Sequence, residues 1–341
     1  MGRGLAVRTH VRGGPSLASY VAGAGLYRRD VGPGSVGSSA LGGVGAGPVC
    51  WGEVRVVLRR DVGDGMDRPI VVGIDGSPGG LAAVEWAMLE GRLRGLPVRL
   101  VYALRGRYRE VTERDRTIAR DRLGEALKVA GSVTSKVVPT GDIVPGQPIA
   151  ALVEASESAA FVVTGSRGMT AVPGLPLGSV SRRVAEYAHC DVVVVPEPRA
   201  VTYRTLVVGM DGSPGAELAL EFAFQEAALR GSELRVVHAY HPVVPFGAAD
   251  PSRDGVSEEA RWLTDRLATW TAKYPGVPVR TRVVPGNPVF ALAATAVHAD
   301  LLVVGARGRG GFRGLRLGAV GQGVLNHCPA PIAVVRDGHR P

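Results

Sequence analysis

The stretch Ile70-Val-Val-Gly-Ile-Asp75-Gly-Ser-Pro78 decides the fold, because nearly the same residues return as Leu206-Val-Val-Gly-Met-Asp211-Gly-Ser-Pro214. Each copy is an apolar run that ends in an aspartate and is followed by a serine-proline pair. An apolar run without polar alternation is typical of a parallel strand that is buried on both faces. Serine is a favourable N-cap and proline fits the first helical position, so the stretch predicts a strand that leads into a helix.

A second pair of matching segments shows that the whole unit is repeated. Val162-Val-Thr-Gly165-Ser-Arg-Gly168 returns as Val303-Val-Gly305-Ala-Arg-Gly308. The aspartates of the first stretch lie 136 residues apart, and the glycines of the second lie 140 residues apart. The second copy therefore contains four additional residues between these motifs, which we place after its second strand, in residues 241–247.

Within each copy, apolar strands alternate with segments of helical period. The first copy predicts strands at 69–75, 98–103, 136–139, 161–165 and 192–195, with helices from 78 to about 91–95, near 110–130, at 149–158 and at 179–189. The second copy repeats this order and ends in a strand at 332–335. Such alternation predicts right-handed crossovers and an open parallel sheet with helices on both faces. The predicted fold class is α/β, with two tandem five-stranded sheets in domains 67–199 and 200–338.

The first 66 residues differ in composition from the rest of the chain. They are rich in glycine, serine, alanine and valine, as in Leu41-Gly-Gly-Val-Gly-Ala-Gly. Glycine offers no side chain for packing and loses much backbone entropy on ordering, so we expect neither helix nor strand here. Two interpretations stay open: a disordered tail, or a natural start at Met66 with the upstream residues outside the native protein.

Composition excludes several classes of function. Hydrophobic residues make up 45% of the 341 residues, yet no apolar run approaches the roughly 20 residues of a membrane helix, so no membrane partner is expected. Three cysteines without a CxxC pair indicate neither a disulfide framework nor a zinc site, which favours the reducing cytoplasm. Residues 1–66 carry eight arginines against four acids, a large part of the net charge of +9, and aromatic residues are scarce at 5%. Nucleic acid is therefore not an expected partner.

The glycine-rich loop after the strand at 161–165 is the most informative segment for function. Gly165 and Gly168 open it, and Gly178 and Ser179 close it at the start of a helix. Glycines let backbone N–H groups turn toward an anion, and a helix N-terminus adds a favourable dipole, so the pattern predicts a phosphate site. We expect Ser179 to be the N-cap and to reach a terminal phosphate. A long surface loop without a ligand is the alternative, and the absence of G-x-x-x-x-G-K-[ST] excludes a P-loop NTPase.

The spacing G-x2-G-x9-G-[ST], together with V-G-x-D-G-S-P around the first strand, resembles the universal stress protein family over residues 67–338. The resemblance implies the HUP-type fold (adenine nucleotide alpha hydrolase-like) with strand order 3-2-1-4-5. It also implies ATP binding, which part of the family shows, and pairing of domains through their fifth strands. A tandem chain would then resemble such a dimer made from one polypeptide, and we expect it to form a homodimer in turn.

Carried over position by position, the resemblance implies that Asp75 approaches the adenosine and that the backbone of Ala103 contacts the adenine. The glycines and Ser179 would surround the ribose and the phosphates. The implied site of the first copy is Asp75, Ala103, Gly165, Arg167, Gly168, Gly178, Ser179 and Val180. The implied site of the second copy is Asp211, Ala239, Gly305, Arg307, Gly308, Gly318, Ala319 and Val320.

The second copy departs from the family pattern at Ala319, where serine or threonine is expected. The missing hydroxyl weakens phosphate binding by about 0.5–3 kcal/mol, depending on the charge of its partner. The second loop is richer in arginine, at Arg307, Arg309, Arg313 and Arg316, and these side chains either pair with phosphate or form a solvated surface. We expect the first copy to be the better-formed site.

These observations lead to one preferred function and two alternatives. The preferred function is an ATP-binding regulator in stress or dormancy adaptation, with Mg²⁺ accompanying the ATP and an unidentified regulatory protein as partner. It is not expected to be an enzyme beyond slow ATP hydrolysis, because no general base or metal-ligand set is evident. The alternatives are a scaffold protein with empty sites and a nucleotide hydrolase or adenylyl-transfer enzyme of the same fold.

Overall fold

The repeated stretch folds as its sequence predicts. In the computed structural model, which describes residues 49–51, 54–56, 68–105, 111–169, 177–196, 201–240, 252–310 and 316–337, Ile70–Ile74 form strand β3 and Pro78–Arg94 form helix α1. Ser77 is the N-cap of α1, since its hydroxyl oxygen accepts a hydrogen bond of 3.0 Å from the N–H of Gly80. Gly95 ends the helix in the left-handed region, at a φ of 70°.

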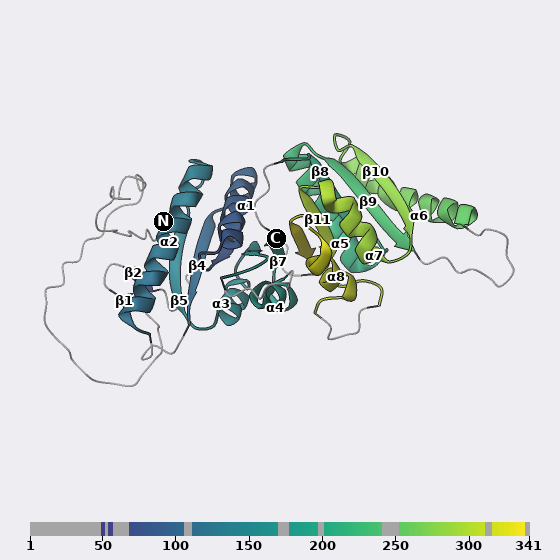
Figure 1. Cartoon of the computed structure of the whole chain (residues 1–341). Coiled ribbons are helices and arrows are strands. Elements are labelled where there is room, and N and C mark those ends of the chain that lie inside the picture. Colours follow the sequence, from purple (N-terminus) through teal and green to yellow (C-terminus); the bar gives the residue numbers. More distant parts are fainter. Residues whose placement is uncertain are drawn as a thin grey trace, which may run out of the picture.

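Two domains of alternating strands and helices follow each other along the chain (Figure 1). Domain 1 continues with β4 (Val98–Leu104), α2 (Glu113–Val133), β5 (Thr140–Pro145), α3 (Pro148–Ala155), β6 (Phe161–Gly165), α4 (Ser179–Tyr187) and β7 (Asp191–Val195). Domain 2 contains β8 (Thr205–Gly209), α5 (Pro214–Arg230), β9 (Glu233–Tyr240), α6 (Ser252–Lys273), β10 (Val279–Pro285), α7 (Pro288–Thr295), a short 3₁₀ helix η2 (Ala296–His298), β11 (Leu301–Gly305), α8 (Ala319–His327) and β12 (Ile332–Val335).

The third strand of domain 1 differs from its predicted position at 136–139. The strand is β5, which pairs in parallel with β4 from Thr140 opposite Arg99 to Pro145 opposite Leu104. The apolar residues that suggested a strand belong to the connection after α2, where Val138 is 55% exposed. Tertiary pairing with β4 thus overrides the local apolar pattern.

The strands form one sheet whose order is β10-β9-β8-β11-β12-β7-β6-β3-β4-β5. Each half has the order 3-2-1-4-5, as the family resemblance implied. The halves meet at β7 and β12, the fifth strand of each domain, which pair antiparallel with Ala333 opposite Val193. The two predicted five-stranded sheets are therefore present and are joined edge to edge in one chain. Pairing with a second copy of the chain stays a prediction.

Helices cover both faces of the sheet, and a separate apolar core lies under each set. One core packs α1, α2, α5 and α6 against the sheet and includes Ile70, Val72, Leu123, Leu220 and Leu263. The other packs α3, α4, α7 and α8 against the opposite face and includes Val71, Val101, Leu152, Val184 and Leu292. Successive residues of β3 alternate between the two cores, as expected for a strand that is buried on both sides.

The glycine-rich N-terminal segment contains a short antiparallel pair of strands. Strand β1 (Val49–Trp51) pairs with β2 (Val54–Val56), with Val49 opposite Val56. The expectation that residues 1–66 form no strand is therefore wrong at this point. Residues 49–56 are richer in valine, which favours strands, than the glycine-rich residues before them. The rest of residues 1–66, like the inserted residues 241–247, lies outside the described residues, and the choice between a tail and a start at Met66 stays a prediction.

Four charged side chains connect the domains where α1 and α5 lie beside each other. Glu90 and Glu226 are fully buried, and each forms ion pairs with both Arg94 and Arg230. The Arg230–Glu226 pair has an Nε–Oε2 distance of 2.7 Å. Burial and the neighbouring carboxylate of Glu226 raise the pKa of Glu90 to about 7. This ion quartet lies on the side of the sheet that α1 and α5 cover.

In the described part of the chain, no helix combines the length and apolar character that crossing a membrane demands.

Candidate functional site

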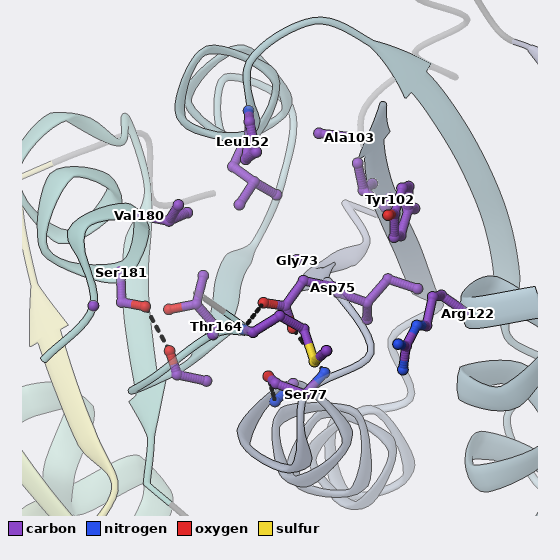
Figure 2. A pocket seen from close by; sticks show the side chains of 18 of the residues that line it. Gly73, Asp75, Ser77, Tyr102, Ala103, Arg122, Leu152, Thr164, Val180 and Ser181 are labelled. Atoms are coloured by element: carbon purple, nitrogen blue, oxygen red, sulfur yellow. Dashed lines mark hydrogen bonds between the residues drawn. The ribbon is translucent and has the colours of Figure 1, made fainter. Parts of the chain in front are cut away.

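A cavity of about 520 Å³ opens in domain 1 beyond the carboxyl ends of β3, β4 and β6 (Figure 2). This is the point where the order of the strands reverses, which is the usual ligand position in open α/β sheets. The cavity brings together six separate segments of the chain, at 73–80, 101–105, 115–122, 148–152, 164–169 and 177–181. All of the site residues predicted for the first copy line it, namely Asp75, Ala103, Gly165, Arg167, Gly168, Gly178, Ser179 and Val180.

The glycines of the loop are required by close contacts. A Cβ atom on Gly165 would lie 2.4 Å from the carbonyl carbon of Gly79 at the start of α1, and one on Gly168 would lie 2.4 Å from a carboxylate oxygen of Asp75. The described glycines with positive φ lie elsewhere in the chain. At these two positions glycine lets the loop lie directly against α1 and Asp75, and the turning of loop N–H groups toward an anion stays a prediction.

The entry into α4 also differs from the prediction. Gly178 is the N-cap, with its N–H donating to the carbonyl oxygen of Ser166 at 2.7 Å, and Ser179 is the first residue of the helix. The prediction that Ser179 is the N-cap is thus wrong, because the hydrogen bond to Ser166 holds Gly178 in the extended conformation of a cap. Ser181 secures the same turn by donating its hydroxyl to the carbonyl oxygen of Gly165 at 2.5 Å.

Asp75 connects the end of β3 to the glycine loop. One of its carboxylate oxygens accepts the N–H of Ser77 at 2.9 Å, and the other accepts the N–H of Met169 at 2.8 Å. Sequence reasoning did not find this role, because Met169 is 94 residues away along the chain. An approach of Asp75 to adenosine stays a prediction, whereas its positioning of the loop is a feature of the structure.

The loop side of the cavity is suited to an anion. The first N–H groups of α4 have no partner within the helix and carry the positive end of its dipole. Arg167 of the loop lines this side, and the cavity as a whole is also lined by Arg105, Arg122 and the carboxylates of Asp75 and Asp115. Among these lining side chains, positive charges exceed negative charges, which favours a phosphate-bearing ligand.

The opposite side of the cavity contains residues that sequence reasoning missed. Tyr102 of β4, Arg122 of α2 and Leu152 of α3 point toward Asp75 from three elements (Figure 2). Arg122 donates from Nη1 to the carbonyl oxygen of Gly76 at 3.1 Å. Burial raises the pKa of Tyr102, so its hydroxyl stays a donor at neutral pH. Only the neighbouring position of Ala103 pointed to Tyr102, and nothing in the polar pattern of α2 pointed to Arg122.

Domain 2 repeats the loop geometry closely. A Cβ atom on Gly305 would lie 2.5 Å from the carbonyl carbon of Gly215, and one on Gly308 would lie 2.7 Å from Asp211. Asp211 accepts the N–H groups of Ser213 at 2.9 Å and Arg309 at 3.1 Å, as Asp75 does in domain 1. The other predicted residues sit at matching positions: Ala239 near the end of β9, Arg307 in the loop, Gly318 as the N-cap of α8, and Ala319 and Val320 as its first residues.

Two arginines of the second loop have aromatic partners within the protein. The guanidinium of Arg316 lies 5.5 Å from the ring centre of Tyr187 in domain 1, and that of Arg309 lies 5.6 Å from the ring centre of Trp262. Arg313 lies outside the described residues, as do residues 170–176 of the first loop. Phosphate pairing by Arg309 or Arg316 would therefore need these aromatic contacts to be replaced.

Comparisons with known proteins agree with this geometry. Residues 66–196 and 202–336 each match the model of the universal stress protein family. A universal stress protein of Mycobacterium tuberculosis is 36% identical over 299 residues, which cover 78% of this chain and 94% of the relative. The crystal structure of a universal stress protein from Archaeoglobus fulgidus superposes with a TM-score of 0.61 at 20% identity and covers 79% of this chain and 98% of its own.

A universal stress protein solved in complex with cAMP matches a single domain, covering 38% of this chain and 95% of its own at 32% identity and a TM-score of 0.32. The family model, by contrast, matches both halves of this chain, and the mycobacterial relative matches nearly over its full length. This chain belongs to the universal stress protein family, as a tandem of two such domains.

Proposed function

We propose that domain 1 binds ATP, with Mg²⁺ held through the phosphates, and that occupancy of the site regulates a partner protein in stress or dormancy adaptation. The observation that carries this proposal is the convergence of the predicted residues on one cavity of about 520 Å³. A cavity of this size lies within the usual range for cofactor-sized ligands.

The two sides of the cavity support a nucleotide with separate apolar and charged ends. Val101, Leu104, Ile118 and Leu152 provide an apolar side near the end of β4, which suits a planar base. The glycine loop, the N-terminus of α4 and Arg167 provide the side that suits phosphates. Magnesium is usually coordinated by substrate phosphates and by the waters that it retains, so it needs few protein ligands here.

A regulatory role fits the chemistry of the lining residues better than catalysis does. Both carboxylate oxygens of Asp75 accept backbone hydrogen bonds, which assigns it to holding the loop. Ligand binding at this loop can shift its conformation and change the surface that a partner contacts. We expect any ATP hydrolysis to be slow.

The test is nucleotide content and binding of the full chain. The purified protein is heated, released nucleotide is identified by chromatography, and ATP with Mg²⁺ is titrated by calorimetry. We expect co-purified ATP or binding at one site or more. Gly168→Glu should abolish binding in domain 1, because any side chain there collides with Asp75, whereas Gly131→Glu on the exposed side of α2, with nothing within 4 Å of its Cβ position, should not.

A chain that contains no nucleotide and binds none on addition of ATP and Mg²⁺ would contradict the proposal. The scaffold alternative would then be the better account. Turnover far above the slow background would instead favour the enzyme alternative.

A further inference from the structure

The two domains share the glycine loop but differ in the side chains that face it. The differences lie at three positions around the cavity of domain 1, one on the second strand, one on the following helix and one in the loop. The helical positions are equivalent because in each domain the side chain at that position lies against the glycine that follows the aspartate, Arg122 against Gly76 and Trp262 against Gly212. The pairs, domain 1 first, are Tyr102 and His238, Arg122 and Trp262, and Met169 and Arg309.

In domain 2, the helical and loop positions contact each other. A Cβ atom on Gly212 would lie 2.8 Å from the indole of Trp262 and 3.0 Å from Nη2 of Arg309, so both side chains reach the same glycine. The guanidinium carbon of Arg309 lies 5.6 Å from the ring centre of Trp262, a cation–π contact. We call this pair the Trp262–Arg309 bridge, because it links α6 to the glycine loop.

His238 and Glu259 support the bridge from inside the domain. The ring of His238, which is 3% exposed, lies 4.7 Å from that of Trp262. Its Nδ1 is 2.7 Å from the carbonyl oxygen of Met210, and its Nε2 is 3.0 Å from Oε2 of Glu259. Contacts with both ring nitrogens hold the imidazole in place against the indole.

A second guanidinium group, that of Arg266, contacts the same indole. Arg266 lies 5.3 Å from the ring centre of Trp262 and is itself held by Glu217, with an Nη1–Oε1 distance of 2.5 Å. Trp262 is therefore contacted by an imidazole and two guanidinium groups of its own domain. These contacts compete with the stacking of a nucleotide base on the indole.

The same two positions leave the cavity of domain 1 open. Arg122 and Met169 both line that cavity, from α2 and from the loop. Arg122 is directed to the carbonyl oxygen of Gly76, and Met169 is 56% exposed. A bridge between these positions would cross the space that the cavity occupies, and Trp262 and Arg309 form such a bridge at the equivalent positions of domain 2.

We propose that the Trp262–Arg309 bridge closes the second site, so that the tandem chain binds one adenine nucleotide, in domain 1. The inference rests on the proposed function of domain 1 and adds an inhibitory contact to it. A nucleotide enters domain 2 only after the bridge opens, and the affinity of that domain is reduced by the small fraction of open molecules. The absence of a hydroxyl at Ala319 acts in the same direction but is a separate cause.

The experiment counts ATP sites per full-length chain by calorimetry with ATP and Mg²⁺, and it exchanges the facing residues between domains. Wild type should bind one equivalent. Trp262→Arg/Arg309→Met, which gives domain 2 the residues of domain 1, should bind two. Arg122→Trp/Met169→Arg, the reverse exchange, should bind none. Arg309→Met alone changes an exposed side chain, so the variant should fold normally. It should raise the occupancy of domain 2 in photolabelling with an azido analogue of ATP.

The control is Ala319→Ser, which restores the hydroxyl and leaves the bridge in place. It should still bind one equivalent, and a gain to two would overturn the bridge as the cause of closure. Two equivalents in wild type would also overturn the inference and leave the proposed function intact. No binding in wild type would overturn the proposed function. The Trp262→Arg/Arg309→Met chain would then test the bridge separately: a new site in domain 2 would support the bridge as the cause of closure, and the absence of a new site would overturn it.

Discussion

At the scale of single residues, the site of domain 1 depends on how closely its backbone segments approach each other. Gly165 lies against α1 and Gly168 lies against Asp75, at distances that no Cβ atom allows. Asp75 then uses both carboxylate oxygens to hold the end of β3 to the loop. The geometry of the site thus depends on close contacts between backbone segments and on the carboxylate of Asp75.

The contact of Gly165 predicts a clear stability difference. Gly165→Ala should destabilise the fold by about 1–3 kcal/mol, because its Cβ would overlap the backbone of Gly79 and force the loop away from α1. The matched control is Gly124→Ala in the interior of α2, where a Cβ meets nothing within 4 Å. That change should stabilise by about 0.5–1 kcal/mol through helix propensity. Urea denaturation of both chains measures the difference, and equal effects would contradict the argument.

The carboxylate of Asp75 predicts a binding difference between the domains. Asp75→Asn keeps the size of the side chain but replaces one acceptor oxygen by an amide donor, so the N–H of either Ser77 or Met169 loses its partner. Affinity for ATP in domain 1 should fall about ten- to hundredfold, the equivalent of one lost charge-assisted hydrogen bond. Asp211→Asn is the control in domain 2 and should leave the domain-1 affinity unchanged. Calorimetry compares the two.

At the scale of elements, the start of α1 serves both the helix and the site. Ser77 caps α1 through the N–H of Gly80, and its hydroxyl also donates to the carbonyl oxygen of Arg167 in the loop at 3.2 Å. The repeat shows the same arrangement, with Ser213 capping α5 and donating to Arg307 at 3.4 Å. One serine in each domain therefore couples the helix to the glycine loop.

Removal of this hydroxyl predicts a loss of both contacts. Ser77→Ala should lower the free energy of unfolding by about 1–2 kcal/mol, the usual effect of a lost N-cap. The control Ser132→Ala removes an exposed hydroxyl that bonds only its own helix, to the carbonyl oxygen of Val129, and should change stability by less than about 0.5 kcal/mol. Thermal unfolding measures both variants, and a silent Ser77→Ala would contradict the assignment of Ser77 as a cap.

At the scale of the whole molecule, the domains are joined by the β7–β12 strand pair and by the ion quartet of Glu90, Arg94, Glu226 and Arg230. The two carboxylates are fully buried, so their ionisation is linked to folding. Arg336 adds a further connection, because its backbone N–H donates to Asp191 at 2.9 Å and its guanidinium donates to the carbonyl oxygens of Ala185 and Ala188.

The quartet predicts a dependence of stability on pH. The pKa of Glu90 is raised by burial, and by the carboxylate of Glu226, from 4.5 to about 7 in the folded chain. Between these pH values the folded state binds the proton and the unfolded state does not, so stability should fall as pH rises from 5 to 7. The slope is at most about 1.4 kcal/mol per pH unit, the energy of one unit of pKa difference.

Denaturation of Glu90→Gln over the same pH range is the measurement. Glutamine mimics the protonated carboxyl, so the variant should show a flatter profile than wild type and should be more stable relative to wild type at pH 7 than at pH 5. Glu258→Gln, an exposed glutamate on α6, should retain the wild-type slope. A wild-type profile that rises from pH 5 to pH 7 in parallel with Glu90→Gln would contradict the raised pKa.

The order of strands and helices, the repeat and the positions of the glycine loop could be predicted from the amino-acid sequence, because each depends on local properties. Apolar runs, the caps Ser77 and Ser213, and glycine spacing act over a few residues and can be read along the chain. The third strand at Thr140–Pro145 was misplaced because its position depends on pairing with β4. The strand order came from the family resemblance, and the structure confirms it.

The side chains that face the loop and those that join the domains became evident from the folded chain. Arg122 and Trp262 occupy equivalent positions on polar helices. Arg122 donates to the carbonyl oxygen of Gly76, whereas Trp262 contacts Arg309, the loop residue that stands where domain 1 has Met169. The ion quartet joins residues as far as 140 positions apart in sequence. Such contacts depend on how helices lie across a folded sheet, and no local pattern of sequence encodes that arrangement.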